Sequence, residues 1–288
     1  FEISFRKLPY GAAFPSMRES RRIIDSVSIS DIFYFSATPP NDLFFSIAKK
    51  YIDFMKFKTR FVAVYHAFPR INLFIEKTYL ASMRKLISSF EAIHALSKWQ
   101  QYVILKYLGF QKERVYHIPN GVDTSKYYFR ENAVNDTFTI LYTGRHEYDK
   151  GFDIALLIMD NLLKSVKNIK VVVTGYGRLT YMIKKLLKKY DNLWYLGYVP
   201  SNEMPTIYNR AHILLAPSRS DVMPLRILEA QACGLPVVGS KILGIAEIII
   251  NNVTGRLIKL DRKKSLDKMV NEFIKAILHY KHLWEMNN

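Results

Sequence analysis

Residues 218–236, SRSDVMPLRILEAQACGLP, constrain the fold of this chain more than any other segment. They lie between two short apolar runs, residues 213–216 and 237–239, which fit buried strands. Pro224 suits the first turn of a helix, where its missing N–H costs nothing, and Gly234 suits the left-handed residue that ends one. We therefore predict a strand, a helix and a second strand, with the two strands parallel in one sheet.

Two acidic residues in this segment are candidates for a binding site. Asp221 lies in the loop after the first strand, and Glu229 follows eight residues later on the helix. Ligands of parallel α/β sheets bind outside the carboxyl ends of the strands, so these carboxylates can accept hydrogen bonds from hydroxyls of one polyol ligand. Alternatively, Asp221 caps the helix and Glu229 is solvated, and the spacing alone does not separate the two interpretations.

Short apolar runs alternate with helical segments along the whole chain. In the first half we expect strands at 1–6, 31–37, 60–67, 92–96 and 115–118, and helices at 18–26, 42–54, 72–88 and 98–108. In the second half we expect strands at 138–144, 170–175, 193–196, 213–216, 237–239 and 255–258, with helices between them. With a polar linker at 126–137, this pattern predicts an α/β protein of two doubly wound domains, residues 1–127 and 128–288.

The composition is typical of a globular protein, with 49% hydrophobic and 23% charged residues among 288. The single cysteine, Cys233, cannot form an internal disulfide and no signal peptide is recognised, so we expect a cytoplasmic location. The formal charge is +17, and residues 1–130 hold 20 basic against 10 acidic side chains. Such a field attracts nucleic acids, anionic lipids or phosphorylated substrates. No RNA-binding, helix-turn-helix or zinc-binding pattern occurs, so we do not expect a nucleic-acid partner.

A second motif, GRHEYDKG at residues 144–151, places two cations between a strand and a helix. Helix N-termini attract phosphate, and Arg145 and Lys150 would strengthen that attraction. Arginine grips two phosphate oxygens at once, whereas lysine supplies a mobile point charge. We expect both side chains to be exposed, and the alternative is a pair of solvated loop cations without a ligand.

Five motifs occur together: PNGVD at 119–123, GRHEYDKG at 144–151, TGYG at 174–177, LGYV at 196–199, and Asp221-x7-Glu229 followed by AQACGLPVV. As a set, across residues 90–260, they resemble the retaining, nucleotide-sugar-dependent glycosyltransferases of the GT-B fold, group 1 and family 4-like. The resemblance implies two Rossmann-like domains that face each other across a cleft, with the sugar donor held by the second. The last helix would pack back toward the first domain.

The resemblance implies a site for the nucleotide part of the donor. Arg145 and Lys150 would bind the diphosphate. Backbone groups at Gly144 and Leu225 would also contact it. Glu229 would hold the ribose hydroxyls.

The resemblance also implies roles for residues around the base and the transferred sugar. The backbone at Tyr198 would contact the base. Asp221 would contact hydroxyls of the transferred sugar and His66 would lie near the reacting sugar, so these two are the candidate catalytic residues. Asn120 and Gly121 would form the turn between the domains. No metal and no cofactor is expected beyond the nucleoside-diphosphate sugar itself.

The chain departs from the family pattern in three places. Asp221 stands where the family usually has glutamate, which puts the choice of sugar and full activity in doubt. Pro224 stands where glycine or proline occurs, but it donates no hydrogen bond. The family's first strand and glycine-rich acceptor loop have no counterpart before Phe1, a deficit of about 30 residues or one βαβ unit. Either the chain is cut or acceptor binding is unusual.

We expect transfer of a sugar from a UDP- or GDP-sugar to a glycan, lipid-linked or other acceptor, with retention and without a metal. The alternatives are an epimerase or phosphorylase on the same fold, and a non-catalytic GT-B-fold protein with a basic surface. The presence of both Arg145 and Lys150 favours the transferase over the non-catalytic alternative. The basic first domain, with Arg18, Arg21 and Arg22 on one short helix, also suggests peripheral contact with an anionic membrane surface. The alternative is that this charge only keeps the chain soluble.

Overall fold

The computed structural model describes residues 5–7, 13–15, 32–37, 60–65, 90–131, 137–261 and 265–286. The chain divides into two compact units, Phe1–Pro119 and Asn120–Asn288. This boundary lies eight residues before the one expected between residues 127 and 128. The side chain of Tyr127 accounts for the difference, because it is 7% exposed and packs in the core of the second unit.

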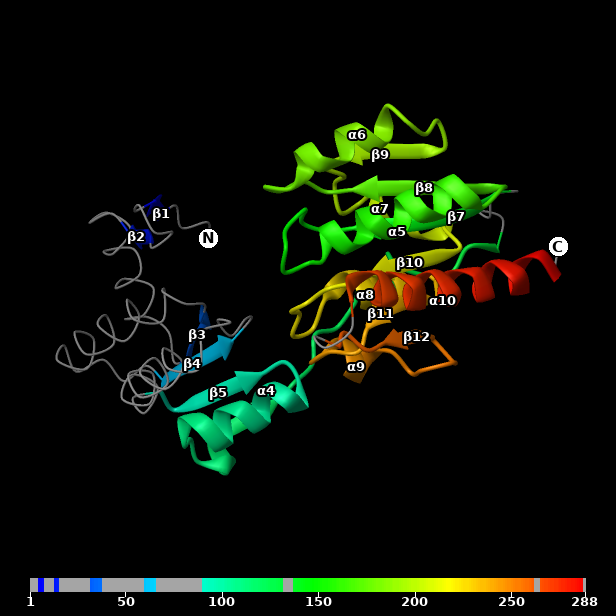
Figure 1. Ribbon diagram of the computed structural model, residues 1–288. Coiled ribbons are helices and arrows are strands. Elements are labelled where there is room, and N and C mark those ends of the chain that lie inside the picture. The colour runs from blue at the N-terminus through cyan, green and yellow to red at the C-terminus, as the bar shows by residue number, and fades with distance from the viewer. Residues whose placement is uncertain are drawn as a thin grey trace. The chain divides into compact units, whose positions relative to one another are not determined.

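The first unit contains a parallel sheet in the order β3-β4-β5-β6 within its described residues (Figure 1). Its strands are Ile32–Ala37, Arg60–Tyr65, Ala92–Ala95 and Val115–His117. A separate antiparallel pair, β1 at Phe5–Lys7 and β2 at Ala13–Pro15, forms where one strand at 1–6 was expected. The helices expected at 18–26, 42–54 and 72–88 lie outside the described residues, and so does His66.

The helix expected at residues 98–108 forms as two segments. Ser97 caps α4, Lys98–Val103, by accepting a hydrogen bond from the backbone N–H of Gln100 at 3.1 Å. The chain continues as a π-helical turn, Ile104–Leu108, and leaves it at Gly109, whose φ of 67° is left-handed. Glycine adopts this conformation without the strain that a side chain would cause.

The second unit is built on a parallel sheet in the order β12-β11-β10-β7-β8-β9 (Figure 1). From β7 to β12 its strands are Phe138–Thr143, Ile169–Thr174, Leu193–Gly197, Ile213–Ala216, Val237–Ser240 and Gly255–Ile258. All six were expected, within one residue at each end, because most are short apolar runs bounded by turns. On β7, Leu141 pairs with Leu214 of β10 on one side and with Val172 of β8 on the other.

Helices cover both faces of this sheet. One face packs on α5, Phe152–Ser165, and on α10, Leu266–Met286, which also contact each other. The opposite face packs on α7, Met204–Asn209, α8, Leu225–Ala232, and α9, Ile245–Ile248. Successive residues of β7 point to opposite layers, with Ile140 in the first core and Leu141 in the second. The packing of the last helix against the first domain stays a prediction.

The strand order reverses beside β7, and this positions the site. The chain passes from β7 to β8 on one side, whereas β10 pairs with β7 on the other. Loops that leave the carboxyl ends of such strands diverge, and ligands of open parallel sheets bind in the crevice between them. Residues 144–151, 175–179 and 217–224 leave β7, β8 and β10 at this point.

The helix at the centre of the longest motif begins one residue later than expected. Pro224 is not in the first turn but is the N-cap of α8, with an extended backbone at ψ 116°. Gly234 follows the helix with a φ of 75°, as predicted. In the described parts of the chain, no helix has the length and apolar character needed to cross a bilayer.

Candidate functional site

Two glycines bring the ends of β7 and β8 into close backbone contact. Gly144 has a φ of 129° and Gly175 a φ of 102°, in a region that favours glycine. A Cβ at Gly175 would lie 2.0 Å from the carbonyl oxygen of Gly144. A register shift between Val173 and Thr174, where β8 pairs with β9, precedes this contact. The absence of side chains therefore lets the two loops meet at the mouth of a cavity.

A cavity of about 500 Å³ opens at these strand ends, entirely within the second unit. Its lining comes from the loops after β7, β8 and β9 and from α7 and α8, together with Tyr127. Four predicted site residues line it: Gly144, Arg145, Tyr198 and Glu229. Three others, Lys150, Asp221 and Leu225, do not. The long motif and the GRHEYDKG loop thus meet in one site, although they contribute unequally to its wall.

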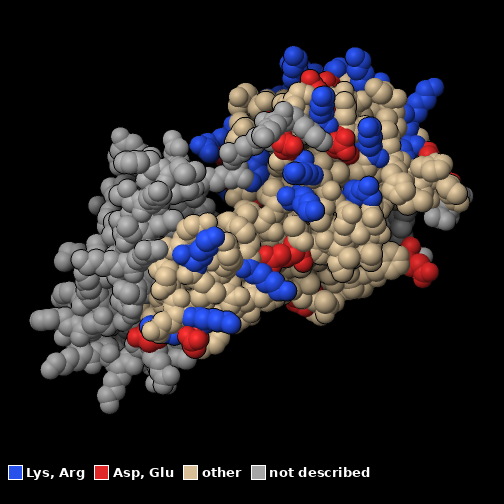
Figure 2. Space-filling view, turned by 60° about the horizontal axis from the view of Figure 1, so that its bottom comes forward, with Lys and Arg blue, Asp and Glu red and all other residues tan. Residues whose placement is uncertain are grey.

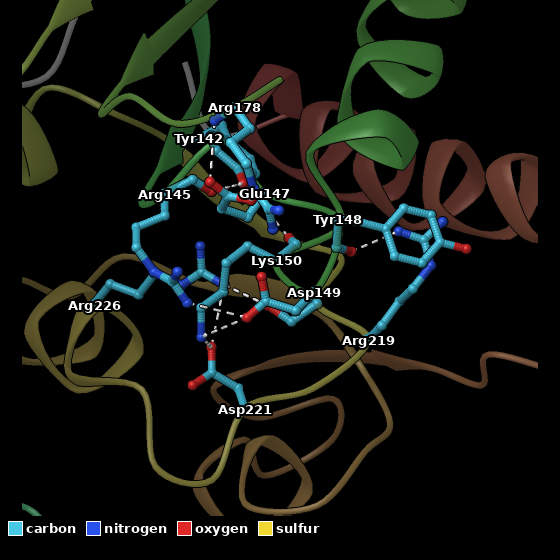
Figure 3. Close-up of polar contacts among 11 residues, drawn as sticks. Tyr142, Arg145, Glu147, Tyr148, Asp149, Lys150, Arg178, Arg219, Asp221 and Arg226 are labelled. Carbon is cyan, nitrogen blue, oxygen red and sulfur yellow. Dashed lines mark hydrogen bonds and ion pairs between the residues drawn. The ribbon is translucent and has the colours of Figure 1, made fainter. Parts of the chain in front are cut away.

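Ion pairs connect the cations and acids of the two motifs (Figure 3). The Nζ of Lys150 lies 2.9 Å from an Asp221 carboxylate oxygen and 3.9 Å from that of Asp149. Arg145 pairs with Asp149 at 3.1 Å. The expected exposure of Arg145 is confirmed, since its side chain is 65% exposed, but that of Lys150 is wrong, at 18%. Pairing with Asp221, itself 11% exposed, draws Lys150 into the protein.

The sequence interpretation missed Arg226, the second residue of α8. Its guanidinium donates hydrogen bonds to the carbonyl of Thr143 at 2.6 Å and to the hydroxyl of Ser218 at 2.5 Å. It also lies 3.5 Å from the Asp221 carboxylate, and its side chain is 11% exposed at the cavity wall. A Cβ at Gly144 would lie 2.7 Å from its Nη1. The sequence did contain an indication of its role, because Arg226 lies three residues before Glu229 and both therefore lie on one helix face.

A tyrosine holds the carboxylate of Glu229 at the cavity wall. The hydroxyl of Tyr208 donates to Glu229 Oε2 at 2.8 Å. Burial, with a contribution from Glu229, raises the pKa of Tyr208 well above its usual value and that of Tyr127 to about 12. Both phenols therefore stay protonated near neutral pH. The alternative in which Glu229 is a solvated helix residue does not fit this arrangement, and α8 has no side-chain cap from Asp221.

Buried contacts fix the GRHEYDKG loop beneath the cavity. The ring of His146 stacks on Phe152 with centroids 3.8 Å apart, and its Nδ1 lies 3.0 Å from the hydroxyl oxygen of Thr180. Burial lowers the pKa of His146. Glu147 accepts hydrogen bonds from the backbone and side chain of Arg178, and these hold its pKa below the usual range. The loop is therefore anchored directly after Arg145.

The remaining predicted residues lie around the rim. The rings of Tyr198 and Tyr176 are 70% and 65% exposed and meet edge to face, with centroids 6.3 Å apart. Leu225 is 50% exposed at the start of α8. Asn120 donates to the carbonyl of Met223 at 2.8 Å, so the predicted turn docks on the long motif. Gly121 has space around it, since a Cβ there would meet nothing within 4 Å.

Comparison with protein families accounts for these motifs as a set. The model described as "Glycosyl transferases group 1" matches residues 123–284, and that described as "Glycosyltransferase Family 4" matches residues 4–126. The chain belongs to the group 1 glycosyl transferases. The family expected from the sequence is thereby confirmed. The change from one match to the other, between residues 123 and 126, lies close to the boundary between the two compact units.

This group 1 glycosyl transferase is similar in sequence to curated proteins of several kinds. It is 27% identical to the phosphatidylinositol N-acetylglucosaminyltransferase gpi3 subunit of Schizosaccharomyces pombe, over 49% of this chain and 32% of the relative. It is 25% identical to the amylovoran biosynthesis glycosyltransferase AmsK of Erwinia amylovora, over 74% of this chain and 54% of the relative. The chain therefore spans only about a third to a half of the length of these relatives.

Solved structures confirm the fold class as GT-B, with parallel α/β sheets. Anabaena Alr3699/HepE, in complex with UDP and glucose, matches 90% of this chain and 74% of its own length, with a TM-score of 0.69 at 19% identity. The pneumococcal O-GlcNAc transferase GtfA, in complex with UDP and GlcNAc, matches 96% of this chain and 55% of its own length. Its TM-score is 0.73 at 16% identity.

Proposed function

We propose that this chain transfers a glycosyl group from a nucleoside-diphosphate sugar to an acceptor, with retention and without a metal. The observation that carries the proposal is one cavity lined by two arginines and by a glutamate held by a tyrosine. Cations suit a diphosphate, and an anchored carboxylate suits the vicinal hydroxyls of a ribose. The UDP complexes of Alr3699/HepE and GtfA, which share the fold, support a UDP-sugar as the first donor to test.

Diphosphate binding is assigned to Arg145 and Lys150, with backbone groups at Gly144 and at the start of α8. No side chain caps α8, so the first backbone N–H groups of this helix, at Leu225 and Arg226, are available to an anion. The exposed rings of Tyr176 and Tyr198 suit a base at the rim, in addition to the proposed backbone contact at Tyr198.

The chemical step requires stabilisation of the diphosphate as it leaves. Positive charges beside the leaving group do this, and Arg145, which lines the cavity, and Lys150 supply them here. Asp221 is proposed to contact hydroxyls of the transferred sugar. His66 keeps its proposed role beside the reacting sugar on the resemblance alone. We assign no nucleophile, because the proposed route is attack on the same face of the sugar, assisted by the leaving phosphate.

A screen for nucleotide binding and donor hydrolysis tests this proposal without knowledge of the acceptor. Calorimetry with UDP and with GDP should give a dissociation constant for one of them, and the corresponding sugar nucleotides should be hydrolysed slowly. Binding without any hydrolysis or transfer would instead support the non-catalytic alternative. Failure of both nucleotides to bind would overturn the proposed donor site.

Glu229→Gln should weaken UDP binding about 3- to 10-fold, because the amide keeps the shape but loses the anionic acceptor for ribose hydroxyls. On the wild type, 2′-deoxy-UDP should bind more weakly than UDP, and on the variant this difference should nearly disappear. Calorimetry on the four combinations measures the coupling. Glu247→Gln, the same change at an exposed position on α9, is the control. If the loss of affinity caused by Glu229→Gln and the loss caused by removal of the 2′-hydroxyl add fully, Glu229 does not contact that hydroxyl.

The acceptor is proposed to be a glycan or a lipid-linked or other anionic molecule. Figure 2 shows Lys and Arg side chains of the described residues spread over the visible surface, with Asp and Glu among them. Arg18, Arg21 and Arg22, which suggested membrane contact, lie outside the described residues.

If the first domain rests on an anionic bilayer, the protein should sediment with phosphatidylglycerol vesicles at low salt and be released near 0.5 M salt, since screening shortens the field to about 3–5 Å. Protein that stays in the supernatant at low salt would contradict the membrane proposal. A saccharide or protein acceptor would then be tested next.

A further inference from the structure

Three cations lie in or beside the proposed diphosphate site, and their positions are not equivalent. Arg145 and Arg226 line the cavity, whereas Lys150 does not. The Nζ of Lys150 instead lies 2.9 Å from Asp221, and both side chains are largely buried, at 18% and 11% exposure. Binding of a diphosphate in the cavity by Lys150 would move its ammonium toward the cavity and weaken this contact with Asp221.

If Lys150 moves away, the carboxylate of Asp221 loses its nearest cation. A buried carboxylate that loses its cation is strongly unfavourable unless another positive group remains beside it. Asp149 cannot replace Lys150 as a partner of Asp221, because it is also an acid. It pairs with Arg145 and lies 3.9 Å from Lys150. Among the described residues that pair with Asp221, the other is Arg226, with its Nη2 at 3.5 Å.

Two hydrogen bonds already hold the guanidinium of Arg226 beside the carboxylate of Asp221. Its Nη1 donates to the carbonyl of Thr143 at the end of β7, and its Nη2 donates to Ser218 in the loop after β10. Figure 3 shows its guanidinium beside Lys150 and Asp221. A guanidinium carries five donors in a rigid fork, so these two bonds leave others for a carboxylate.

We propose that Arg226 is a positioning residue that holds Asp221 in place when Lys150 leaves it for the diphosphate of the donor. The inference rests on the proposed function, because it needs Lys150 to serve the diphosphate. Arg226 acts through Asp221, and its effect on nucleotide affinity arises from the release of Lys150. The carboxylate then stays where it can meet the transferred sugar.

A double-mutant cycle between Arg226 and Asp221 tests the proposal, with calorimetric affinity for UDP, or for GDP if the wild type binds that nucleotide. Arg226→Gln should weaken binding about 10-fold, because Asp221 then keeps Lys150. Asp221→Asn alone should strengthen binding about 3-fold, because Lys150 is free. The double variant should recover at least 3-fold of the loss caused by Arg226→Gln. The proposal would be overturned if Arg226→Gln did not weaken nucleotide binding. It would also be overturned if the double variant bound no more tightly than Arg226→Gln.

Arg226→Lys separates the proposed role from a merely structural one. Lysine keeps a positive charge beside Asp221 but cannot keep both hydrogen bonds to Thr143 and Ser218. Action through Asp221 predicts a loss of affinity below 3-fold in this variant, whereas a purely structural role predicts a larger one. This comparison also serves if Arg226→Gln does not fold.

A matched control uses Arg219, an arginine in the loop that leads into α8. Arg219 makes a two-bond ion pair with Asp153, at 2.6 and 2.7 Å, and does not line the cavity. On an Arg219→Gln background, Asp221→Asn should strengthen UDP binding no more than it does in the wild type. A larger gain there would show that the recovery is unspecific and would overturn the assignment to Arg226. A wild type that binds neither UDP nor GDP would overturn the proposed function itself, a result distinct from a failed cycle.

Discussion

Replacing Lys150 with alanine should weaken UDP binding 10- to 100-fold and lower the turnover of the sugar donor at least as much. The expected loss corresponds to about 1.4–2.7 kcal/mol, the range of a hydrogen bond to a charged group. The physical reason is that Lys150 is the proposed mobile cation of the diphosphate site. Calorimetry gives the affinity, and initial rates of donor hydrolysis give the turnover. Unchanged affinity would remove Lys150 from the site.

Stability distinguishes this lysine from the neighbouring arginine. Lys150→Ala should also lower the free energy of unfolding, by about 1–3 kcal/mol, because Asp221 is buried and would keep only the longer contact to Arg226. Arg145→Ala should change it by less than about 0.5 kcal/mol, since Arg145 is 65% exposed and surface ion pairs contribute little. Equal stability losses in denaturant titrations of the two variants would contradict this difference in burial.

Gly175→Ala should lower the free energy of unfolding by about 2–4 kcal/mol and abolish nucleotide binding in the fraction that folds. The added Cβ would lie 2.0 Å from the carbonyl oxygen of Gly144, and the φ of 102° is itself unfavourable for alanine. The clash is with backbone, so no side chain can turn aside to relieve it. Urea titration measures the stability, and calorimetry with UDP measures the site.

Gly197 provides the matched control for this substitution. Its φ of 67° is also left-handed, but a Cβ there would meet nothing within 4 Å. Gly197→Ala should therefore lower stability by only about 1 kcal/mol, the strain of the backbone conformation alone. Equal losses in the two variants would show that the approach of β8 to Gly144 is looser than the structure indicates.

The local pattern of the chain was sufficient to predict the second sheet. Most of its strands are apolar runs, such as Ile213–Ala216, whose residues are all buried in the fold. Burial of such runs between two helical layers depends only on their composition and spacing, which the sequence states directly. Gly234 similarly marked the end of α8 through a backbone requirement that few residues other than glycine meet. The helix at 98–108 was less predictable, because its change to a π-helical turn at Ile104 has no marker in the sequence.

The sequence by itself also indicated two motifs that line the cavity. Arg145 and Glu229 lie on one cavity because each belongs to a motif at the carboxyl end of a parallel strand, and such ends meet at one edge of a sheet. Position relative to a strand end is a local property. It can be read from the chain without knowledge of the sheet order.

Only the tertiary structure decided which side chains pair with one another. Lys150 and Asp221 are 71 residues apart, and Thr143 and Arg226 are 83 apart, so no spacing rule connects them. Their contacts depend on β10 lying beside β7, which brings the loops after both strands together. Burial then decides their energetics, because a charge removed from water must find an opposite charge or a hydrogen bond close by. For this reason the exposure of Lys150 was predicted wrongly and Arg226 was missed.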